Sequence, residues 1–253
     1  MCGRYTITRP ERIAVEFEPA VVNADLDRPR YNIAPMQKVP ALAIRADKRV
    51  LLDCQWGFVP HWATDPAIGS RMINARAETA ADKPAFRHAF RHNRCLIPAD
   101  GFYEWREADD GKQPMYIQVG SGDLFAFAGL YSVWPGDRVA ESGVAHAASS
   151  GEEPPTGLPA GKTASCVIIT TEPNDLLRPI HNRMPVILPR AAWSRWSDPA
   201  FTDREALCEL LRPFEAGSMS TRSVSRRVNS PTNDDPACIA EFRQDSPAGQ
   251  ALF

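Results

Sequence analysis

The sequence lacks several features that would assign it to a familiar class. No apolar run approaches the roughly 18 residues of a membrane-spanning helix, and polar and charged residues follow Met1, so we expect neither a membrane span nor a signal peptide. The formal net charge of the 253 residues is only −2. No overall positive field therefore draws the chain to nucleic acid, and a polyanion site requires local clustering. No P-loop, G-x-G-x-x-G motif or internal repeat is present.

Closely spaced cysteines are also absent. The chain has six cysteines without a C-x-x-C pair: Cys2, Cys54, Cys95, Cys166, Cys208 and Cys238. Without an export signal, free thiols in a reducing cytosol are the default, so we expect a cytoplasmic protein without structural disulfides. His88 and His92 have the helical spacing of a metal-binding pair, but His88 has no neighbouring glutamate and no third ligand is evident. We expect no metal and no cofactor.

The distribution of apolar residues indicates one α+β domain. At 43% apolar residues the chain can form a sizeable core. We expect strands at 39–46, 50–56, 94–97, 101–106, 115–119, 124–134, 162–171, 184–188 and 220–228, and helices ending at 17 and covering 84–93, 189–197 and 202–213. Many strands with interspersed helices predict an antiparallel, barrel-like β core flanked by helices.

Three further segments lack regular patterns. Residues 23–34 are interpreted as a loop, and the segment rich in Gly, Ser, Pro and Ala at about 135–162 as a flexible surface insertion. The domain is expected to span 1–233 and a C-terminal tail 234–253. Thr8 and Glu11 have the spacing of a capping box ahead of the first helix.

The residues with chemical potential fall in four separated segments. These are MCGRY at the start, NARAE from Asn74, GFYEW from Gly101 and HNRMP from His181. Together they supply a thiol, an amide, a carboxylate, an imidazole and several guanidinium groups, which is a nucleophile with acid–base and orienting groups. No local rule of sequence places the four segments together.

These segments, with WGFVPHW from Trp56 and PADGFYEW from Pro98, resemble the SRAP family, the SOS response-associated peptidases. The resemblance runs from Met1 to about Asn229 and covers nearly the whole chain. It implies a single α+β domain with a β-rich core and a basic groove. It also implies that the protein binds single-stranded DNA, links covalently to abasic sites and shields them in the response to DNA damage.

The chemistry that the resemblance implies depends on Cys2. After Met1 is removed, Cys2 carries an α-amine and a thiol on adjacent carbons. The amine can form an imine with the ring-opened aldehyde of an abasic site, and the thiol can then close a thiazolidine ring. Without the family, a small residue at a strand start is the ordinary interpretation of Cys2.

The same resemblance implies catalytic roles for three further side chains. Glu104 is the proton-transfer group, His181 is the acid–base that helps to open the sugar ring, and Asn74 positions the amine or the sugar hydroxyl. The residues alone leave other interpretations open: a salt-bridged strand carboxylate for Glu104, a hydrogen-bonded structural residue for His181, and a turn-stabilising amide for Asn74.

Basic residues gather between positions 71 and 94. This stretch contains only two acidic residues, Glu78 and Asp82. Its six basic residues are Arg71, Arg76, Lys83, Arg87, Arg91 and Arg94. Guanidinium groups neutralise phosphates, and aromatic faces stack on bases. By resemblance, the DNA-binding residues are Arg4, Arg76, Arg183, Trp62 and Trp105. A solvated helix face is the alternative for Arg87 and Arg91.

Two other functions use the same residues. A cysteine peptidase would use the Cys2 thiol with His181, either on itself or on other proteins. A plain single-strand binding module would leave Cys2 incidental. Crosslinking requires Cys2 at the mature terminus, whereas a thiol peptidase does not in general. We expect a monomer whose partner is single-stranded DNA containing abasic sites, with no membrane contact.

Overall fold

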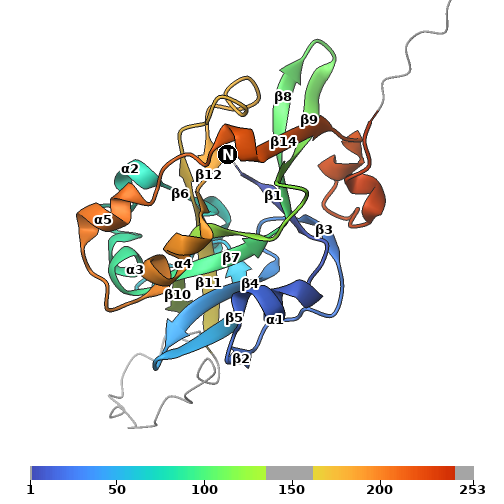
Figure 1. Ribbon diagram of the computed structural model, residues 1–253. Coiled ribbons are helices and arrows are strands. Elements are labelled where there is room, and N and C mark those ends of the chain that lie inside the picture. The colour runs from blue at the N-terminus through green and yellow to red at the C-terminus, as the bar shows by residue number, and fades with distance from the viewer. Residues whose placement is uncertain (1, 135–161, 243–253) are drawn as a thin grey trace, which may run out of the picture.

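The computed structural model describes residues 2–134 and 162–242, and its centre is a closed β-barrel (Figure 1). Each barrel strand pairs with the next in the order β11-β10-β7-β4-β5, and β5 pairs with β11 to close the ring. The strands are β4 (Lys38–Arg45), β5 (Lys48–Trp56), β7 (Arg94–Ala99), β10 (Phe125–Trp134) and β11 (Thr163–Thr171). The β5–β11 pair is parallel, and the other four pairs are antiparallel.

The barrel strands form because their sequences are apolar on both faces. β10 reads FAFAGLYSVW, and nearly all of its side chains are buried. Gly129 lies where two strands meet closely, because a Cβ there would come within 2.8 Å of Ile97 Cδ1 and 2.9 Å of Cys95 Sγ. A larger residue at position 129 would overpack this region.

A second, five-stranded sheet packs one face on the same core. Its order is β14-β9-β8-β1-β3, with bounds β14 (Met219–Ser223), β9 (Gly111–Val119), β8 (Gly101–Ala108), β1 (Arg4–Ile7) and β3 (Arg30–Ile33). Tyr5 pairs with Phe102, which pairs with Ile117, and all three belong to the main core. The opposite face carries Tyr103 and Tyr116, which pack against the C-terminal segment 224–242.

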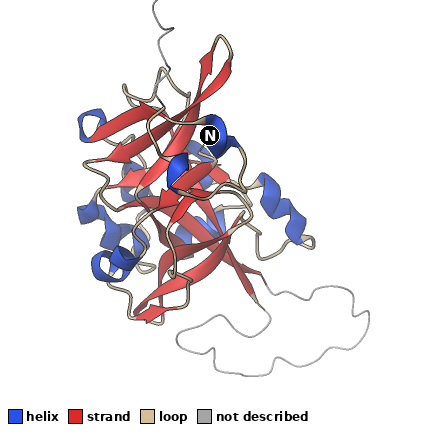
Figure 2. Ribbon diagram, turned by 90° about the vertical axis from the view of Figure 1, so that its right-hand side faces the viewer, coloured by secondary structure: helices blue, strands red, loops and turns tan. Residues whose placement is uncertain are grey.

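Short helices lie on the outside of the strands (Figures 1 and 2). They are α1 (Glu11–Phe17), α2 (Ala77–Ala80), α3 (Arg87–His92), α4 (Trp193–Ser197) and α5 (Arg204–Glu209). The 3-10 turns are η1 (Pro66–Arg71), η2 (Arg190–Ala192), η3 (Ala216–Ser218), η4 (Arg226–Asn229) and η5 (Pro236–Cys238), and the remaining strands are β2 (Val21–Val22), β6 (Asn74–Arg76), β12 (Met184–Pro185) and β13 (Ile187–Leu188). The predicted fold class, an α+β domain with a barrel-like β core flanked by helices, is confirmed.

Several local predictions were wrong. The expected loop at 23–34 contains β3, whose first two residues are partly buried and whose last two are buried as it pairs with β1. The expected strand at 220–228 ends at Ser223 and continues as the 3-10 turn η4. Four-residue elements of this kind are defined by their partners, so a window of local sequence does not reveal them.

The predicted capping box ahead of α1 does not form. Thr8 donates a hydrogen bond from its hydroxyl to Asp100 Oδ2 at 2.7 Å, and the N-cap position is Pro10, without a side-chain cap. The Asp100 carboxylate, which also accepts from the Thr6 hydroxyl at 2.6 Å, outcompetes the local cap and fixes the end of β1 to the start of β8.

The predicted insertion at 135–162 lies outside the described residues except for Lys162, as does the end of the predicted tail, 243–253. The first part of that tail is anchored: Asp234 accepts backbone hydrogen bonds from Tyr31 at 2.5 Å and Asn32 at 2.9 Å. Within 2–134 and 162–242, no helix is both long and apolar enough to span a membrane.

Candidate active site

Cys2 is fully buried immediately before β1. Its thiol donates a weak hydrogen bond to the Arg4 carbonyl, with a distance of 3.9 Å between sulfur and oxygen. Burial, followed by the negative charge of Glu104, raises the pKa of the Cys2 thiol well above its ordinary value. The thiol is therefore protonated near neutral pH and needs a nearby group to accept its proton before it can attack.

Glu104 is the nearby acid–base group. It lies on β8 with its side chain on the core face shared by Phe102, and only 2% of the residue is exposed. Burial raises the pKa of its carboxyl group to about 7. The influence of Glu104 on the Cys2 thiol places the two groups within electrostatic reach. A carboxyl group with this pKa can both donate and accept a proton near neutral pH.

Asn74 holds the backbone of Cys2. Its Nδ2 donates to the Cys2 carbonyl oxygen at 2.8 Å. Its position is set by the parallel pairing of β6 with β11, in which Asn74 is opposite Ile168. Among the described residues, the buried Oδ1 of Asn74 accepts no hydrogen bond. This acceptor is available to a donor that enters the site.

His181 lies in the loop before β12 and is partly buried. His181 Nδ1 lies 3.0 Å from the backbone nitrogen of Arg183 and 3.2 Å from its carbonyl oxygen, so it accepts from the N–H in one tautomer and donates to the carbonyl in the other. Burial lowers the pKa of His181 below its ordinary value, and the ring is mainly neutral at pH 7. In the tautomer that donates from Nδ1 to the Arg183 carbonyl, the unprotonated Nε2 can act as a base, and the imidazolium that it forms can then act as an acid.

The four predicted catalytic residues reach one region from different elements. Cys2 contacts Asn74 directly and interacts electrostatically with Glu104. Strand β11 connects the His181 segment to this region. On one side of β11, Thr170 is opposite Arg76 of β6; on the other side, it is opposite Pro185 of β12, which follows His181 in the chain. In Figure 1 the N-terminus lies near β6 and β12, in agreement with the hydrogen bond from Asn74 to Cys2. Sequence alone could not establish this convergence.

Two predicted DNA contacts, Arg4 and Trp105, meet at a residue that the sequence did not indicate. The Arg4 guanidinium donates to Asn32 Oδ1 at 2.8 Å, to the Val228 carbonyl at 2.6 Å and to the Asn229 carbonyl at 3.1 Å. Trp105 Nε1 donates to Asn229 Oδ1 at 2.8 Å. Asn229 therefore connects both side chains, although Arg4 uses much of its donor capacity within the protein.

The other two predicted arginines differ in how they are held. Arg183 forms a two-pronged ion pair with Glu78 at 2.6 and 3.0 Å and also donates to the Thr170 carbonyl at 2.5 Å. Arg76 is exposed at the end of β6. The hydrogen bond from Arg183 lowers the pKa of Glu78 against the opposing effect of burial, and the charge of Arg76 lowers it further. Glu78 belongs to the NARAE segment, but no local pattern indicates its pairing with Arg183.

Trp62 is the most exposed of the predicted aromatic contacts. It is 49% exposed and borders a hollow of about 410 Å³ that Ile68 and Arg71 also line. A half-exposed indole presents an aromatic face on which a base can stack. Trp62 is thus suited to stacking on a base, whereas the indole N–H of Trp105 is held by Asn229.

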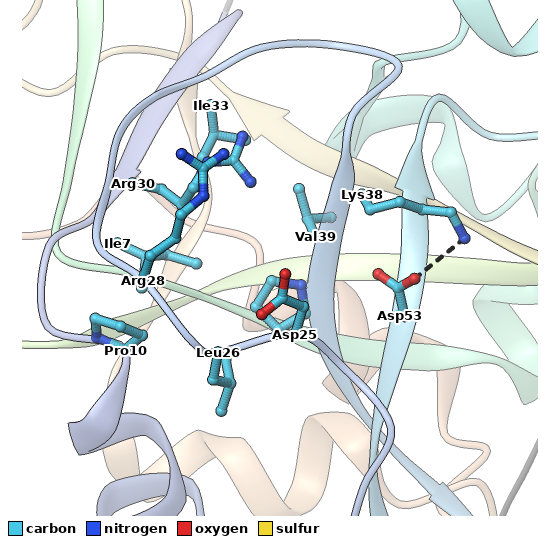
Figure 3. Close-up of a pocket in the computed structure, with 11 residues that line it drawn as sticks. Ile7, Pro10, Asp25, Leu26, Arg28, Arg30, Ile33, Lys38, Val39 and Asp53 are labelled. Carbon is cyan, nitrogen blue, oxygen red and sulfur yellow. Dashed lines mark ion pairs between the residues drawn. The ribbon is translucent and has the colours of Figure 1, made fainter. Parts of the chain in front are cut away.

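A smaller cavity of about 70 Å³ lies at the other end of β1, where Ile7 and Pro10 line it (Figure 3). Figure 3 shows Lys38 and Asp53 facing each other across β4 and β5, with an ion pair of 3.2 Å. Arg30 is likewise paired with Asp234 at 2.8 Å. These charges neutralise one another, and we do not assign this cavity to the candidate active site.

The described part of the chain has no group of side chains arranged as a metal-binding site. No three His, Cys, Asp or Glu side chains within residues 2–134 and 162–242 are arranged to hold a metal ion. The six cysteines are all free thiols. The candidate active site therefore offers acid–base groups, a thiol and hydrogen-bond donors from the protein itself.

The sequence matches known proteins along almost its entire length. The family model for SOS response associated peptidase (SRAP) matches residues 1–231. The abasic site processing protein YoqW of Bacillus subtilis is 40% identical over 248 residues, which are 94% of this chain and 99% of that protein. The abasic site processing protein YedK of Escherichia coli is 30% identical over 246 residues, with 94% and 99% covered.

Solved structures show the same fold. A protein from Bacteroides thetaiotaomicron superposes with a TM-score of 0.77 at 23% identity, covering 96% of this chain and 100% of that one. A phage-related protein from Bordetella bronchiseptica gives a TM-score of 0.58 at 29% identity, covering 89% and 95%. With the family match over residues 1–231, these similarities establish that the chain belongs to the SRAP family.

Proposed function

We propose that this protein processes abasic sites in DNA by forming a covalent thiazolidine crosslink through Cys2. The names of the similar proteins YoqW and YedK support abasic sites as the substrate class. The observation that carries the chemical proposal is the combination of Cys2, whose carbonyl is held by Asn74, with a buried Glu104 whose pKa is about 7.

The reaction requires Met1 to be removed so that Cys2 has a free α-amine. The amine adds to the C1′ aldehyde of the ring-opened sugar, and loss of one water gives an imine. The imine is protonated at this stage. The Cys2 thiol gives its proton to the Glu104 carboxylate as the sulfur attacks the imine carbon, and a five-membered thiazolidine with a neutral N–H closes. The net change is one aldehyde plus one aminothiol giving a thiazolidine and water, without an oxidant, a metal or a cofactor.

Glu104 and His181 divide the proton transfers. Protonated Glu104 supplies the proton that the departing water requires, and the resulting carboxylate accepts the proton of the Cys2 thiol. His181 moves a proton when the closed sugar opens to the aldehyde: its neutral imidazole takes the proton of the C1′ hydroxyl, and the imidazolium so formed protonates the ring oxygen as its bond to C1′ breaks. Asn74 fixes Cys2, which limits the number of orientations that the reacting atoms can adopt.

The nucleic-acid partner in this proposal is a single strand. An abasic sugar in a single strand can approach a buried thiol without first being extracted from a duplex. The exposed Arg76 and Trp62 supply a phosphate contact and a stacking surface, and Arg4, Arg183 and Trp105 line the approach to the reacting groups. The protein acts as a monomer in this scheme, because all four reacting or positioning side chains belong to one chain.

Substitutions at Cys2 test the proposal because they separate the amine from the thiol. The native protein, mixed with a single-stranded oligonucleotide containing one abasic site, should give a shifted band on a denaturing gel without any reductant. Cys2→Ser keeps the amine and should give a stable band only when borohydride reduces the imine. A shifted band of native intensity from Cys2→Ala would contradict the proposed role of the thiol.

The cysteine peptidase alternative requires a thiolate at neutral pH, usually stabilised by a neighbouring imidazolium. Burial raises the pKa of the Cys2 thiol and lowers that of His181, which opposes such an ion pair. The crosslinking reaction instead needs a neutral thiol near a proton acceptor, which is the arrangement of Cys2 and Glu104. The geometry therefore favours crosslinking.

A further inference from the structure

Three histidine rings form a row on the surface, separate from the candidate active site. His61 lies in the loop after β5, and His88 and His92 lie one turn apart on α3. The ring centroids of His61 and His88 are 5.1 Å apart, as are those of His88 and His92. All three residues are exposed. We call His61, His88 and His92 the imidazole row.

The imidazole row borders a cavity of about 190 Å³. Its apolar floor includes Phe58 and Ala89, and its rim includes His61, His88 and Asn93. Imidazole rings in contact at a surface repel one another when more than one is protonated, so an arrangement of three favours either neutral rings or a bound anion.

The charged groups around the imidazole row are mostly cationic. On α3, Arg87 and Arg91 are exposed, and Arg94 follows at the start of β7. Burial, then the charges of His88, Arg91 and Arg94, lowers the pKa of His92. A second cavity beside His92, of about 270 Å³, has Arg91 and Arg204 at its rim.

The acidic group near that second cavity is already neutralised. Asp82 forms an ion pair with Arg204 at 2.7 Å. Its charge is therefore largely committed, and the positive charge of Arg87 and Arg91 dominates at the imidazole row. An anion placed here would offset the repulsion among these cations and favour protonation of the rings.

A linear polyanion fits this surface better than a metal ion does. Across residues 2–134 and 162–242 no three ligating side chains have metal-binding geometry, and the row runs along the surface instead of converging on a point. His61 is also adjacent in sequence to Trp62, the half-exposed indole suited to base stacking. A strand that stacks on Trp62 can continue over the row.

We propose that the imidazole row, with Arg87 and Arg91, binds the backbone phosphates of single-stranded nucleic acid, and that binding there takes up protons. This inference rests on the proposed function for the identity of the strand. Because protonated rings bind phosphate more tightly than neutral rings, the affinity for a single strand rises as the pH falls. A histidine whose pKa increases by one unit on binding contributes about a tenfold change in affinity.

The test uses an undamaged single-stranded oligonucleotide, so that no covalent chemistry takes part. Fluorescence anisotropy between pH 5.5 and 8.0 at fixed ionic strength, with a chelator present, gives the affinity. Calorimetry in two buffers that differ in ionisation enthalpy gives the number of protons taken up. We expect native affinity to rise about tenfold or more from pH 8.0 to 6.0, and the paired substitutions His88→Asn and His92→Asn to remove most of this rise and most of the proton uptake.

Two controls isolate the imidazole row from other titrating groups. Glu104 and His181 are unchanged in the protein with His88→Asn and His92→Asn. Any pH dependence of strand affinity that these two residues cause therefore remains in that protein. Arg204→Gln removes a neighbouring cation without removing a titrating ring, and it should retain the native proton uptake. Thermal unfolding checks that these exposed substitutions leave the fold intact.

The outcomes separate this inference from the proposed function. If the doubly substituted protein binds the strand with the native pH dependence and proton uptake, the imidazole row is not a phosphate contact and the inference is overturned. If the native protein binds no single strand at any pH, the single-strand partner and this inference both fail. Loss of proton uptake with crosslinking to abasic DNA retained supports the row as a separate contact site.

Discussion

The arrangement of Cys2, Asn74 and Glu104 shows how individual side chains acquire reactivity from burial. A cysteine thiol and a glutamate carboxyl group are ordinary groups in water, with pKa values of about 8.5 and 4.3. In this protein, burial moves both pKa values upward, the carboxyl group to about 7. The thiol therefore stays protonated near neutral pH, whereas the carboxyl group can both donate and accept a proton there.

Glu104 should reduce the stability of the protein at high pH. Its pKa is higher in the folded chain than in the unfolded chain, so the folded state binds the proton more tightly between about pH 4.5 and 7. The stabilisation is fully present below that window and is lost as the pH rises through 7, by about 3 kcal/mol in total. Glu104→Gln should therefore be more stable than the native protein at pH 8 and show a weaker pH dependence in urea unfolding.

The same variant tests the catalytic role. Glu104→Gln should slow crosslink formation much more than it weakens binding to an undamaged strand, because glutamine cannot transfer the proton. Equal losses in rate and affinity, together with native pH dependence of stability, would make Glu104 a purely structural residue.

At the residue scale, the sequence indicated the candidate catalytic groups but not the side chains that hold them. Cys2, Asn74, Glu104 and His181 lie in segments with recognisable patterns, and the structure brings their elements together. By contrast, Asn229 contacts Trp105, which is 124 positions away in the sequence, and Glu78 contacts Arg183, which is 105 positions away. Such contacts depend on the tertiary fold, so no local pattern reports them.

Strand β3 is the element that explains why the C-terminal segment lies beside the candidate active site. Asn32 on β3 is fully buried, and its Nδ2 donates to the carbonyls of Val228, Ser230 and Asn233 at 3.1, 3.0 and 2.7 Å. The same amide accepts from Arg4 through Oδ1. A single side chain thus fixes the loop that contacts both Arg4 and Trp105.

Replacing Asn32 with alanine should loosen this loop. Several buried hydrogen bonds are lost at once, and each contributes about 1 kcal/mol, so we expect a destabilisation of about 2–3 kcal/mol in urea unfolding. Single-strand affinity should also fall, because Arg4 and Trp105 lose their common support.

Asn229→Ala is the control for this prediction. It removes the hydrogen bond to Trp105 but leaves the backbone carbonyl for Arg4, and it should lower the free energy of unfolding by under about 1 kcal/mol. A destabilisation of the same size from both changes would contradict this role for Asn32.

The long barrel strands were predictable, whereas the short elements were not. Apolar runs at β5, β10 and β11 are long enough to identify a buried strand from composition alone. β3 has four residues and β6 three, and each is a strand only because β1 or β11 pairs with it. The capping box at Thr8 failed for a related reason, since a distant Asp100 bound the hydroxyl.

On the scale of the whole molecule, the net charge of −2 conceals an uneven distribution. Arg76, Arg87 and Arg91 are exposed, and none of them is paired in the salt bridges of the described residues. Other arginines are neutralised by ion pairs, as Arg30 is by Asp234. Net charge therefore says little about nucleic-acid binding here, and the local field is the relevant quantity.

Arg76 should contribute to single-strand affinity through this field. If it contacts one phosphate, Arg76→Ala should lower the slope of log affinity against log salt by about 0.7. Arg12→Ala, in which the removed cation is ion-paired with Glu16 on α1, is a matched control and should leave the slope unchanged. An identical slope for Arg76→Ala and the native protein would exclude a phosphate contact at this residue.

The intact mass of the protein, alone and after incubation with an abasic single-stranded oligonucleotide, tests the central claim most directly. We predict that the protein alone lacks Met1, and that the product has the summed mass of protein and oligonucleotide minus one water, stable to denaturation without reduction. A protein that retains Met1 and remains unmodified, or an equally stable product from Cys2→Ala, would contradict the account.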